Sequence, residues 1–326
     1  MIMVIGEALI DLIESRQHSG SYQAVVGGAN ANVAIALARA GTPQQLLARI
    51  SSDAFGQKIK ARLEQNKVGL DYAIDAIEPT SLAIASIGDS GIAKYSFYVE
   101  KTADWNFTRQ ELPTEATLSS IGAKALQFGC LTMALGPGNK VIQDWASEFF
   151  KDGSLTLSHD VNARPALGFE AKLERERVEK LNSISHIIKA SDDDINWLYE
   201  LEPGSNLDDI VWGWIGESEQ IVFVTRGPDG VSIYRKGKIR LDVPSRTVQV
   251  QDTVGSGDTF CAHMLTGLLA IDALGQNPSE KLAAVSNEQL IQISKVAAFA
   301  ASITCERTGA EPPTAKELAA VLAAIS

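Results

Sequence analysis

The sequence predicts an α/β protein with a doubly wound, mostly parallel sheet covered by helices on both faces. Short apolar runs typical of buried strands alternate along the chain with longer segments of helical periodicity. Polar or glycine-rich turns follow several of these strands, at the positions where such sheets bind ligands. Residues 80–108 interrupt the alternation with a hairpin pattern, so we expect a second, small β-sheet beside the main one.

Length and continuity favour one structural unit. The chain has 326 residues, of which 45% are hydrophobic, enough for a substantial core. This length also allows two domains, but no repeat or low-complexity segment divides the chain. We therefore expect residues 1–326 to form a single domain that carries the small sheet.

Charge and cysteine content exclude several classes of partner and site. A formal net charge of −11 argues against a nucleic-acid or anionic-membrane partner. Three widely spaced cysteines predict buried free thiols rather than a disulfide framework or a zinc site. The apolar N-terminal run lacks a basic flank, and no apolar run is long enough to span a bilayer. We expect a cytoplasmic protein.

The first strand is expected at residues 1–5, and an aspartate follows it closely. Asp11 is then just past a strand end, where α/β sheets place ligands. From the residues alone, a carboxylate in a surface turn is an equally good interpretation.

A double glycine and an asparagine precede the first expected helix. Gly27 and Gly28 permit a close backbone approach, and Asn32 offers a donor and an acceptor to a polyol. The alanine-rich run over residues 33–40 predicts the helix, which Gly41 ends. Taken alone, a glycine turn and a capping asparagine are more often structural.

The hairpin pattern comprises residues 81–87 and 93–99, joined by a glycine-containing loop at 88–91. The segment 12–26 is expected to add strands to the same small sheet. From about residue 110 onward strands and helices alternate. We expect strands at 125–129, 155–159, 184–189 and 221–225, and helices at 139–151, after residue 194 and at 288–303.

Two of these strands run into polar turns. Thr225, Gly227 and Gly230 permit backbone donors near a phosphate, although a plain tight turn explains them as well. Ser191 and Asp194 follow the preceding strand, where they can cap and charge a helix start.

The stretch with the most chemical information is Asp252-Thr-Val-Gly-Ser-Gly-Asp258-Thr-Phe260. Apolar residues recur after it at helical spacing, so a helix is expected to start near Gly257. Unpaired N–H groups at a glycine-rich helix start form an anion site. Asp258 at the same place suits a base that removes a proton, and the combination indicates phosphoryl transfer. A helix cap after a glycine turn is the simpler alternative.

This stretch resembles the C-terminal signature of the ribokinase-like (PfkB) carbohydrate kinases, with Ser256 where alanine is common. The run from Gly27 to Asn32 resembles their N-terminal signature, and the resemblance covers essentially the whole chain. It implies a ribokinase-like fold, with the small sheet as a lid over the sugar, and an ATP-dependent sugar kinase. Asp258 would then take the proton from the attacking sugar hydroxyl, while Gly255, Ser256 and Gly257 stabilise the phosphoryl group.

The resemblance also assigns binding residues. It implies that the sugar is held by Asp11, Gly27, Gly28 and Asn32. The nucleotide-phosphate loop would comprise Thr225, Gly227 and Gly230. Ser191 and Asp194 stand where the family usually has N-x-x-E, which organises magnesium-bound water and phosphate, so Mg²⁺ is expected with ATP. A potassium ion would be bound through carbonyl groups in the loops that contain Asp252, Thr253, Arg307 and Gly309.

Residues 160–165 resemble the D-x-N-x-R-P string of the fructokinase and 2-keto-3-deoxygluconate kinase branch. Arg164 would either pair with the carboxylate of an acidic substrate or hold its loop together through Asp160. The lid strand offers only Lys94 and Lys101, without the arginine of the keto acid kinases, which favours a neutral ketose. We expect fructose as substrate, with 2-keto-3-deoxygluconate as the alternative. A sugar- or nucleotide-binding protein without turnover is the alternative from another class.

The lid also suggests contacts of its own. Phe97, Tyr98 and Trp105 are candidates to touch the sugar or a partner lid, although lid core is the more common role for each. Exposed strand edges in a small sheet, together with the family resemblance, suggest a homodimer through the lid.

Overall fold

The computed structural model describes residues 1–15, 18, 20–87 and 93–324. Within them, eight strands form the main sheet in the order β14-β13-β12-β11-β10-β9-β1-β4. The six strands from β12 to β4 are parallel, and β13 and β14 add an antiparallel edge. The strands are β1 (Ile2–Ile5), β4 (Gln44–Leu47), β9 (Ala125–Gly129), β10 (Thr156–Asp160), β11 (Ile187–Ser191), β12 (Ile221–Thr225), β13 (Val231–Arg235) and β14 (Ile239–Val243).

Helices cover both faces of this sheet because its strands are apolar on both sides. Ile2 and Val4 pack into one buried cluster, while Met3 and Ile5 pack into another on the opposite face. The first face is covered by α1 (Ala29–Arg39), α2 (Ala54–Gln65), α9 (Ser256–Ala270), α10 (Pro278–Ala284) and α11 (Asn287–Cys305). The opposite face is covered by α3 (Glu115–Ser120), α5 (Gly138–Asp152), α6 (Ala171–Asn182), α7 (Asp192–Leu198) and α8 (Asp208–Trp214).

The remaining elements are short. Helix α4 (Cys130–Ala134) follows β9 directly, and α12 (Ala315–Ala323) packs against α11. Strands β5 (Arg49–Ser51) and β6 (Ile74–Ala76) form a parallel pair. In the described part of the chain, four single turns of 3₁₀ helix lie at η1 (Ala103–Trp105), η2 (Arg109–Glu111), η3 (Pro165–Leu167) and η4 (Gly227–Asp229).

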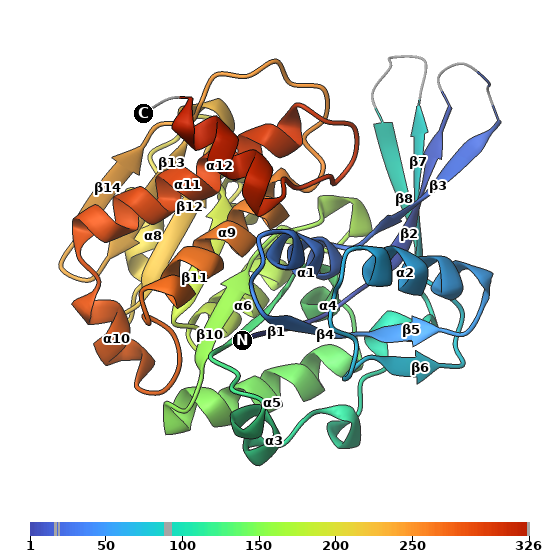
Figure 1. Cartoon of the computed structure of the whole chain (residues 1–326), viewed down its shortest axis with the longest axis horizontal. Coiled ribbons are helices and arrows are strands. Elements are labelled where there is room, and N and C mark those ends of the chain that lie inside the picture. The colour runs from blue at the N-terminus through green and yellow to red at the C-terminus, as the bar shows by residue number, and fades with distance from the viewer. Residues whose placement is uncertain (16–17, 19, 88–92, 325–326) are drawn as a thin grey trace.

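A four-stranded sheet extends from one side of the main body (Figure 1). Its order is β3-β2-β7-β8, with bounds β2 (Leu9–Glu14), β3 (Tyr22–Gly27), β7 (Leu82–Ile87) and β8 (Ala93–Tyr98). The hairpin of β7 and β8 and the added strands from the N-terminal segment are as predicted, but the loop expected at 88–91 lies outside the described residues. This small sheet is called the lid below.

The structure corrects the expected position of Asp11. It does not lie just past the end of the first strand of the main sheet but inside β2, where it pairs in register with Val25 and Ala83. The lid therefore begins at Leu9, three residues earlier than expected, since the chain enters it almost directly after β1. Sequence pattern alone did not separate these two strands because the intervening turn is only three residues long.

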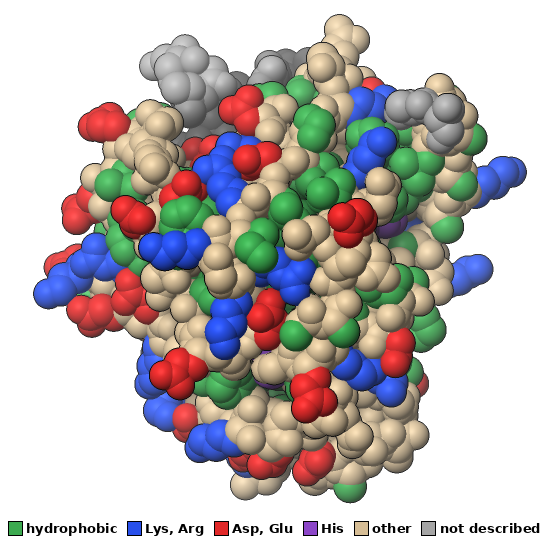
Figure 2. All heavy atoms as spheres, turned by 90° about the vertical axis from the view of Figure 1, so that its left-hand side faces the viewer, with side chains coloured by type: hydrophobic (Ala, Val, Ile, Leu, Met, Phe, Trp, Pro, Cys, Tyr) green, Lys and Arg blue, Asp and Glu red, His purple; other side chains and the backbone are tan. Residues whose placement is uncertain are grey.

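On the face shown in Figure 2, acidic, basic and apolar side chains are interspersed, without a large area of one sign. In the part of the chain that the structure describes, no helix is both long and apolar enough to span a bilayer.

Candidate active site

A cavity of about 480 Å³ lies where the lid, the carboxyl ends of β1, β9 and β10 and the start of α9 come together. Carboxyl ends of parallel strands are the usual ligand-binding edge of such sheets. The cavity is lined by Glu7, Leu9, Asp11, Gly28, Ala29, Asn32, Ala83, Phe97, Cys130, Leu131, Asn162, Ala163, Arg164, Pro165, Ala166, Thr253, Val254, Gly255, Gly257 and Asp258. Sugar-binding and catalytic residues predicted from distant parts of the sequence are thus brought into one place.

Asp258 lies in the first turn of α9, which begins after Gly255 as the glycine-rich stretch predicted. Its carboxylate is buried and accepts a 2.8 Å hydrogen bond from the Asn32 side-chain amide. Burial and the neighbouring Asp160 charge raise the pKa of Asp258 to about 7, although the Asn32 hydrogen bond acts to lower it. A carboxylate with this pKa can accept a proton at neutral pH.

The start of α9 also offers backbone donors. Ser256 N–H donates to the Thr253 carbonyl oxygen, and Thr259 N–H donates to the Gly255 carbonyl oxygen. Among the hydrogen bonds of the described residues, the Gly257 and Asp258 N–H groups have no acceptor. Both lie at a helix N-terminus beside the cavity, where an anion is stabilised by free donors and by the helix dipole.

Gly27 and Asp11 depend on each other. A Cβ atom on Gly27 would lie 1.9 Å from Asp11 Oδ2, so only glycine leaves room for this carboxylate. Burial raises the pKa of Asp11 to about 6, and the positive charge of Arg164 opposes the shift. Gly27 does not itself line the cavity, whereas Gly28, one residue later, does.

The three lid aromatics have different environments. Phe97 lines the cavity, so it can contact a bound sugar. Tyr98 points outward with 59% of its surface exposed, and Trp105 is buried in a small core with Leu9 and Leu131. Trp105 is therefore lid core, the more common role for such an aromatic residue.

Arg164 lines the cavity, and its guanidinium does not bind Asp160. Asp160 instead forms an ion pair with Lys189, with 3.0 and 3.1 Å between Lys189 Nζ and the two carboxylate oxygens. The guanidinium of Arg164 donates to the neighbouring Ala163 carbonyl oxygen. The proposal that Arg164 holds its loop together through Asp160 is therefore wrong, because strand β11 places a closer cation there.

Ser191 and Asp194 form a reciprocal cap at the start of α7. Ser191 Oγ accepts from the Asp194 N–H, and Asp194 Oδ2 accepts from the Ser191 N–H at 2.8 Å. Asp194 Oδ1 also accepts from Ala163 N–H, which ties the Arg164 loop to α7. Neither residue lines the cavity described above.

The predicted phosphate loop lies next to this cap. Thr225 ends β12 and is in register with Ser191, so both segments occupy adjacent positions at the carboxyl edge of the sheet. Gly227 opens a short 3₁₀ turn. A Cβ on Gly230 would lie 2.1 Å from the Val243 carbonyl oxygen, so the turn packs tightly onto β14. These residues lie beside the cavity rather than in it.

The two loops predicted to bind a monovalent cation are joined. Asp252 Oδ2 accepts a 2.8 Å hydrogen bond from Gly309 N–H, and the Thr253 carbonyl oxygen accepts from Ser256. The Arg307 guanidinium points elsewhere and binds the carbonyl oxygens of Glu311 and Pro312 and the Glu317 carboxylate. Only backbone groups of Arg307 remain for a cation.

Sequence reasoning missed Glu7. It is fully buried, lines the cavity and accepts hydrogen bonds from Ala29 N–H, the Asn30 side chain and Thr132. The Asn30 side chain therefore helps to fix Glu7 in the cavity wall and does not itself line the cavity. A signal existed, since Glu7 is an acidic residue only two positions after a buried strand.

Lys189, which lies outside the cavity, and two residues that line it were also missed. Lys189 is a lone charged residue inside an apolar strand, a pattern that indicates a buried ion pair. Cys130 and Asn162 line the cavity from positions after β9 and β10, where their backbones adopt φ of 53° and 38°. Nothing in residue type alone distinguishes these two.

Comparison with known proteins identifies relatives. Residues 1–317 match the pfkB family carbohydrate kinase. A fructokinase from Rhizobium leguminosarum bv. trifolii is 32% identical over 271 residues, covering 82% of this chain and 79% of that protein. Fructokinase-1 of Oryza sativa subsp. japonica is 28% identical over 326 residues, covering 98% and 95%.

Solved structures have the same fold. Fructokinase with bound ATP from Xylella fastidiosa has a TM-score of 0.87 at 24% identity, covering 99% of this chain and 98% of that one. Fructokinase from Vibrio cholerae O395, in its fructose, ADP and calcium ion bound form, has a TM-score of 0.79 at 21% identity, covering 98% and 97%. The predicted ribokinase-like fold is confirmed. Since the family match extends over nearly the whole chain, this protein belongs to the pfkB family of carbohydrate kinases.

Proposed function

We propose that this protein is an ATP-dependent fructokinase that phosphorylates the terminal primary hydroxyl of fructose. The observation that carries the proposal is the position of Asp258, a buried carboxylate beside free helix N-terminal donors in a cavity that the lid covers. Proton acceptor and anion site are then next to one another, as phosphoryl transfer to an alcohol requires. The fructokinases among its relatives support the choice of sugar.

In this mechanism Asp11, Gly28 and Asn32 orient the sugar, and Asp258 accepts the proton of the attacking hydroxyl. The Asn32 amide holds Asp258 in place through the 2.8 Å hydrogen bond, so the base is oriented before substrate binds. The N–H groups of Gly255, Gly257 and Asp258, which have no acceptor among the described residues, face the developing negative charge on the transferred phosphoryl group, whereas the Ser256 N–H donates to the Thr253 carbonyl oxygen instead of taking the role expected for it. The lid excludes water, which would otherwise compete as acceptor.

The nucleotide is expected at the adjacent part of the sheet edge, near Thr225, Gly227 and Gly230. Among the described residues, no group of three or more His, Cys, Asp or Glu side chains forms a metal-binding set. That arrangement fits Mg²⁺ carried mainly by the nucleotide phosphates, since Mg²⁺ usually takes few protein carboxylates. The Asp194 carboxylate already accepts hydrogen bonds from two backbone N–H groups. Its proposed role, together with Ser191, is therefore to order a metal-bound water rather than to bind the metal directly. When bound, Mg²⁺ neutralises phosphate charge.

A potassium site is proposed at the joined loops of Asp252, Thr253, Arg307 and Gly309. The Asp252 hydrogen bond to Gly309 keeps the loops adjacent, and carbonyl groups of both loops are the donors that such a cation prefers. Gly255 is packed against Ala310, so ordering of this loop by a cation would reach the start of α9. Replacing K⁺ by Na⁺ in the assay buffer is expected to lower activity, and equal rates in both salts would remove this part of the proposal.

The position of Arg164 also fits a second substrate. Its guanidinium lines the cavity without an ion pair among the described residues, and a carboxylate of 2-keto-3-deoxygluconate would provide one. Asp11 nearby partly balances that charge, which favours a neutral ketose.

A homodimer through the lid is proposed from the exposed Ile13, Tyr22 and Tyr98, and sedimentation of the Tyr98→Asp variant as a monomer would support it.

The deciding experiment measures ADP formation with fructose, 2-keto-3-deoxygluconate, ribose, adenosine and fructose 6-phosphate. Turnover of fructose alone supports the proposal, and preference for the keto acid makes Arg164 a substrate ligand. In the second case, Arg164→Gln should raise KM for the keto acid and not for fructose. Absence of turnover with every sugar, together with sugar or nucleotide binding by calorimetry, would favour a binding protein without catalysis.

A further inference from the structure

Lys189 is a buried cation that the proposed reaction leaves without a role. It lies in β11 with 3% of its surface exposed, between apolar neighbours in the strand. Burying an ammonium group is costly unless a partner and hydrogen bonds compensate for lost hydration. Its position therefore needs an explanation beyond packing.

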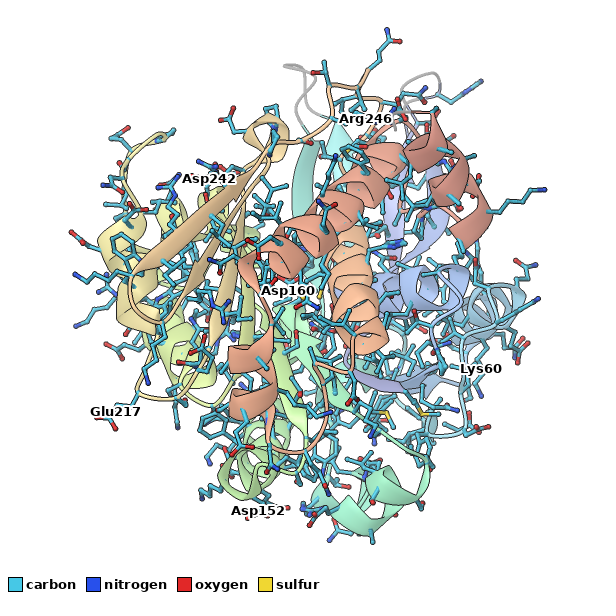
Figure 3. All side chains as sticks on the ribbon, turned by 60° about the vertical axis from the view of Figure 1, so that its left-hand side comes forward. Lys60, Asp152, Asp160, Glu217, Asp242 and Arg246 are labelled. Carbon is cyan, nitrogen blue, oxygen red and sulfur yellow. The ribbon has the colours of Figure 1, made fainter. Side chains whose placement is uncertain are left out.

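The partner of Lys189 is Asp160, at the end of the neighbouring strand β10. Lys189 Nζ lies 3.0 and 3.1 Å from the two oxygens of the Asp160 carboxylate, and both side chains are almost fully buried. In Figure 3, Asp160 lies in the interior of the molecule, whereas Asp152, Glu217 and Lys60 lie around its periphery. The ion pair is thus shielded from solvent and from salt screening.

The same ammonium group lies directly under the start of α9. A Cβ atom on Gly257 would be 2.9 Å from Lys189 Nζ, so glycine at this position allows the lysine to approach the helix. A cation at a helix N-terminus opposes the helix dipole and is unfavourable in isolation. Two carboxylates offset it here, Asp160 on one side and Asp258 in the first turn of the helix.

We propose that the buried Lys189–Asp160 pair is a positioning pair for the catalytic base: it holds the start of α9 and sets the balance of charge around Asp258. The inference rests on the proposed function, since it assumes that Asp258 accepts the proton. Neither Lys189 nor Asp160 lines the cavity, so both act through Asp258 rather than on the substrate.

Groups on β10, β11, α1 and the Arg164 loop act on the pKa of Asp258. Asp160 of β10 raises the pKa of Asp258 in addition to burial, whereas Asn32 of α1, Lys189 of β11 and Arg164 lower it. Burial raises the pKa of the neighbouring Cys130 and Cys261 thiols, so they remain neutral. The two members of the pair therefore shift the pKa of Asp258 in opposite directions, so removing either one alone changes the balance of charge around this carboxylate.

The opposite effects of Asp160 and Lys189 on Asp258 can be tested, because an ion pair with a purely structural role would not change the pH dependence of the reaction. The pH dependence of kcat/KM for fructose is measured for Asp160→Asn, Lys189→Met and the double variant. Asp160→Asn should move the acid-side midpoint to lower pH and Lys189→Met to higher pH, each by about one unit. The double variant, which buries no unpaired charge, should fold and have a midpoint between those of the single variants.

A matched control is the Arg235–Glu219 pair, also largely buried, whose 3.2 Å contact lies away from the cavity. Glu219→Gln should lower the melting temperature without moving the midpoint. Unchanged midpoints in all three Lys189 and Asp160 variants, with Tm as the only loss, would overturn the inference. An active Asp258→Asn protein would instead reject the proposed function, so the two failures are distinguishable.

Discussion

The side-chain amide of Asn32 donates a 2.8 Å hydrogen bond to Oδ2 of Asp258, joining residues 226 positions apart in the sequence. The bond links the start of α1 to the start of α9, the two segments that carry the N-terminal and C-terminal signatures. It orients the carboxylate and favours its charged form, while burial disfavours that form. The predictions below follow from this balance and from the contacts around it.

Replacing the base should abolish catalysis without harming the fold. Asp258→Asn is expected to lower kcat by a factor on the order of 10²–10⁴ or more, since an amide cannot accept the proton. The folded-state pKa of Asp258 is raised from 3.8 to about 7. Stabilisation from such a group is complete below the unfolded pKa and is lost as pH rises through about 7.

The Asn variant should therefore have a melting temperature at pH 8 equal to or above that of the parent. Coupled ADP assays and thermal melts check both parts. Asp152→Asn, at an exposed position of α5, is the matched control and should change neither quantity. Substantial activity in Asp258→Asn would contradict the assignment.

The pH dependence of the reaction should report the same carboxylate. We expect kcat/KM for the sugar to fall as pH drops through about 7, because protonated Asp258 cannot act as a base. Protonation of Asp11, whose pKa is raised to about 6, should add a second loss. Asn32→Ala should move the first midpoint to higher pH, since it removes a hydrogen bond to the charged form. A profile that stays flat from pH 5 to 8 would speak against Asp258.

The contact between Gly27 and Asp11 predicts an effect on sugar binding alone. Gly27→Ala places a Cβ 1.9 Å from Asp11 Oδ2 and must displace that carboxylate from the cavity. KM for the sugar should rise about tenfold, as expected for the loss of one charged hydrogen bond, with KM for ATP unchanged. Gly213→Ala, where the added Cβ meets no atom within 4 Å, is the matched control. An unchanged KM for the sugar would show that Asp11 does not contact it.

Asp53 links helix α2 to the root of the lid. Its carboxylate accepts from Gly56 N–H and from both the N–H and the hydroxyl of Thr80, which precedes β7. Partial burial acts to raise the pKa of Asp53, but the hydrogen bonds from Thr80 and Gly56 lower it to about 2. The stabilisation is present above the unfolded value of 3.8 and is lost as pH falls through about 2.

Asp53→Ala should therefore cost about 1 kcal/mol at pH 7, and the difference from the parent should shrink toward pH 2. It should also raise KM for the sugar several-fold, because the lid loses an anchor. Ser286→Ala removes a comparable cap at the start of α11 and should lower stability without changing KM. Equal effects of both variants on KM would mean that Asp53 acts only as a cap.

Several strands and helices lie where the sequence patterns predicted them. The strand over residues 125–129, the strand over 221–225 and the helix after Gly255 lie where periodicity and glycine placement predicted them. Asp258 and Asn32 were predicted as site residues from motifs, and the fold brings them into contact. Motifs of this kind are recognisable because a glycine turn and a helix start depend on neighbouring residues.

Other contacts could not be predicted from those sequence patterns. Asp11 was expected just past the end of the first strand but lies in a lid strand, and Asp160 pairs with Lys189 rather than with Arg164. Glu7 was not recognised as the buried acceptor that holds Asn30 and Thr132. Each of these contacts depends on which strands become neighbours in a sheet. The local hydrophobic periodicity of the sequence does not predict that strand order.

The sequence by itself therefore determined the α/β class, the mostly parallel sheet and the start of α9, and it singled out Asp258 as the proposed base, because these follow from local propensity and short motifs. Only the tertiary structure decided which charges surround that base, since β10, β11, α1 and α9 meet through sheet order and helix packing. The Lys189–Asp160 pair next to Asp258 forms only when these elements pack together. Because the pair is buried, its charges act strongly on the pKa of Asp258.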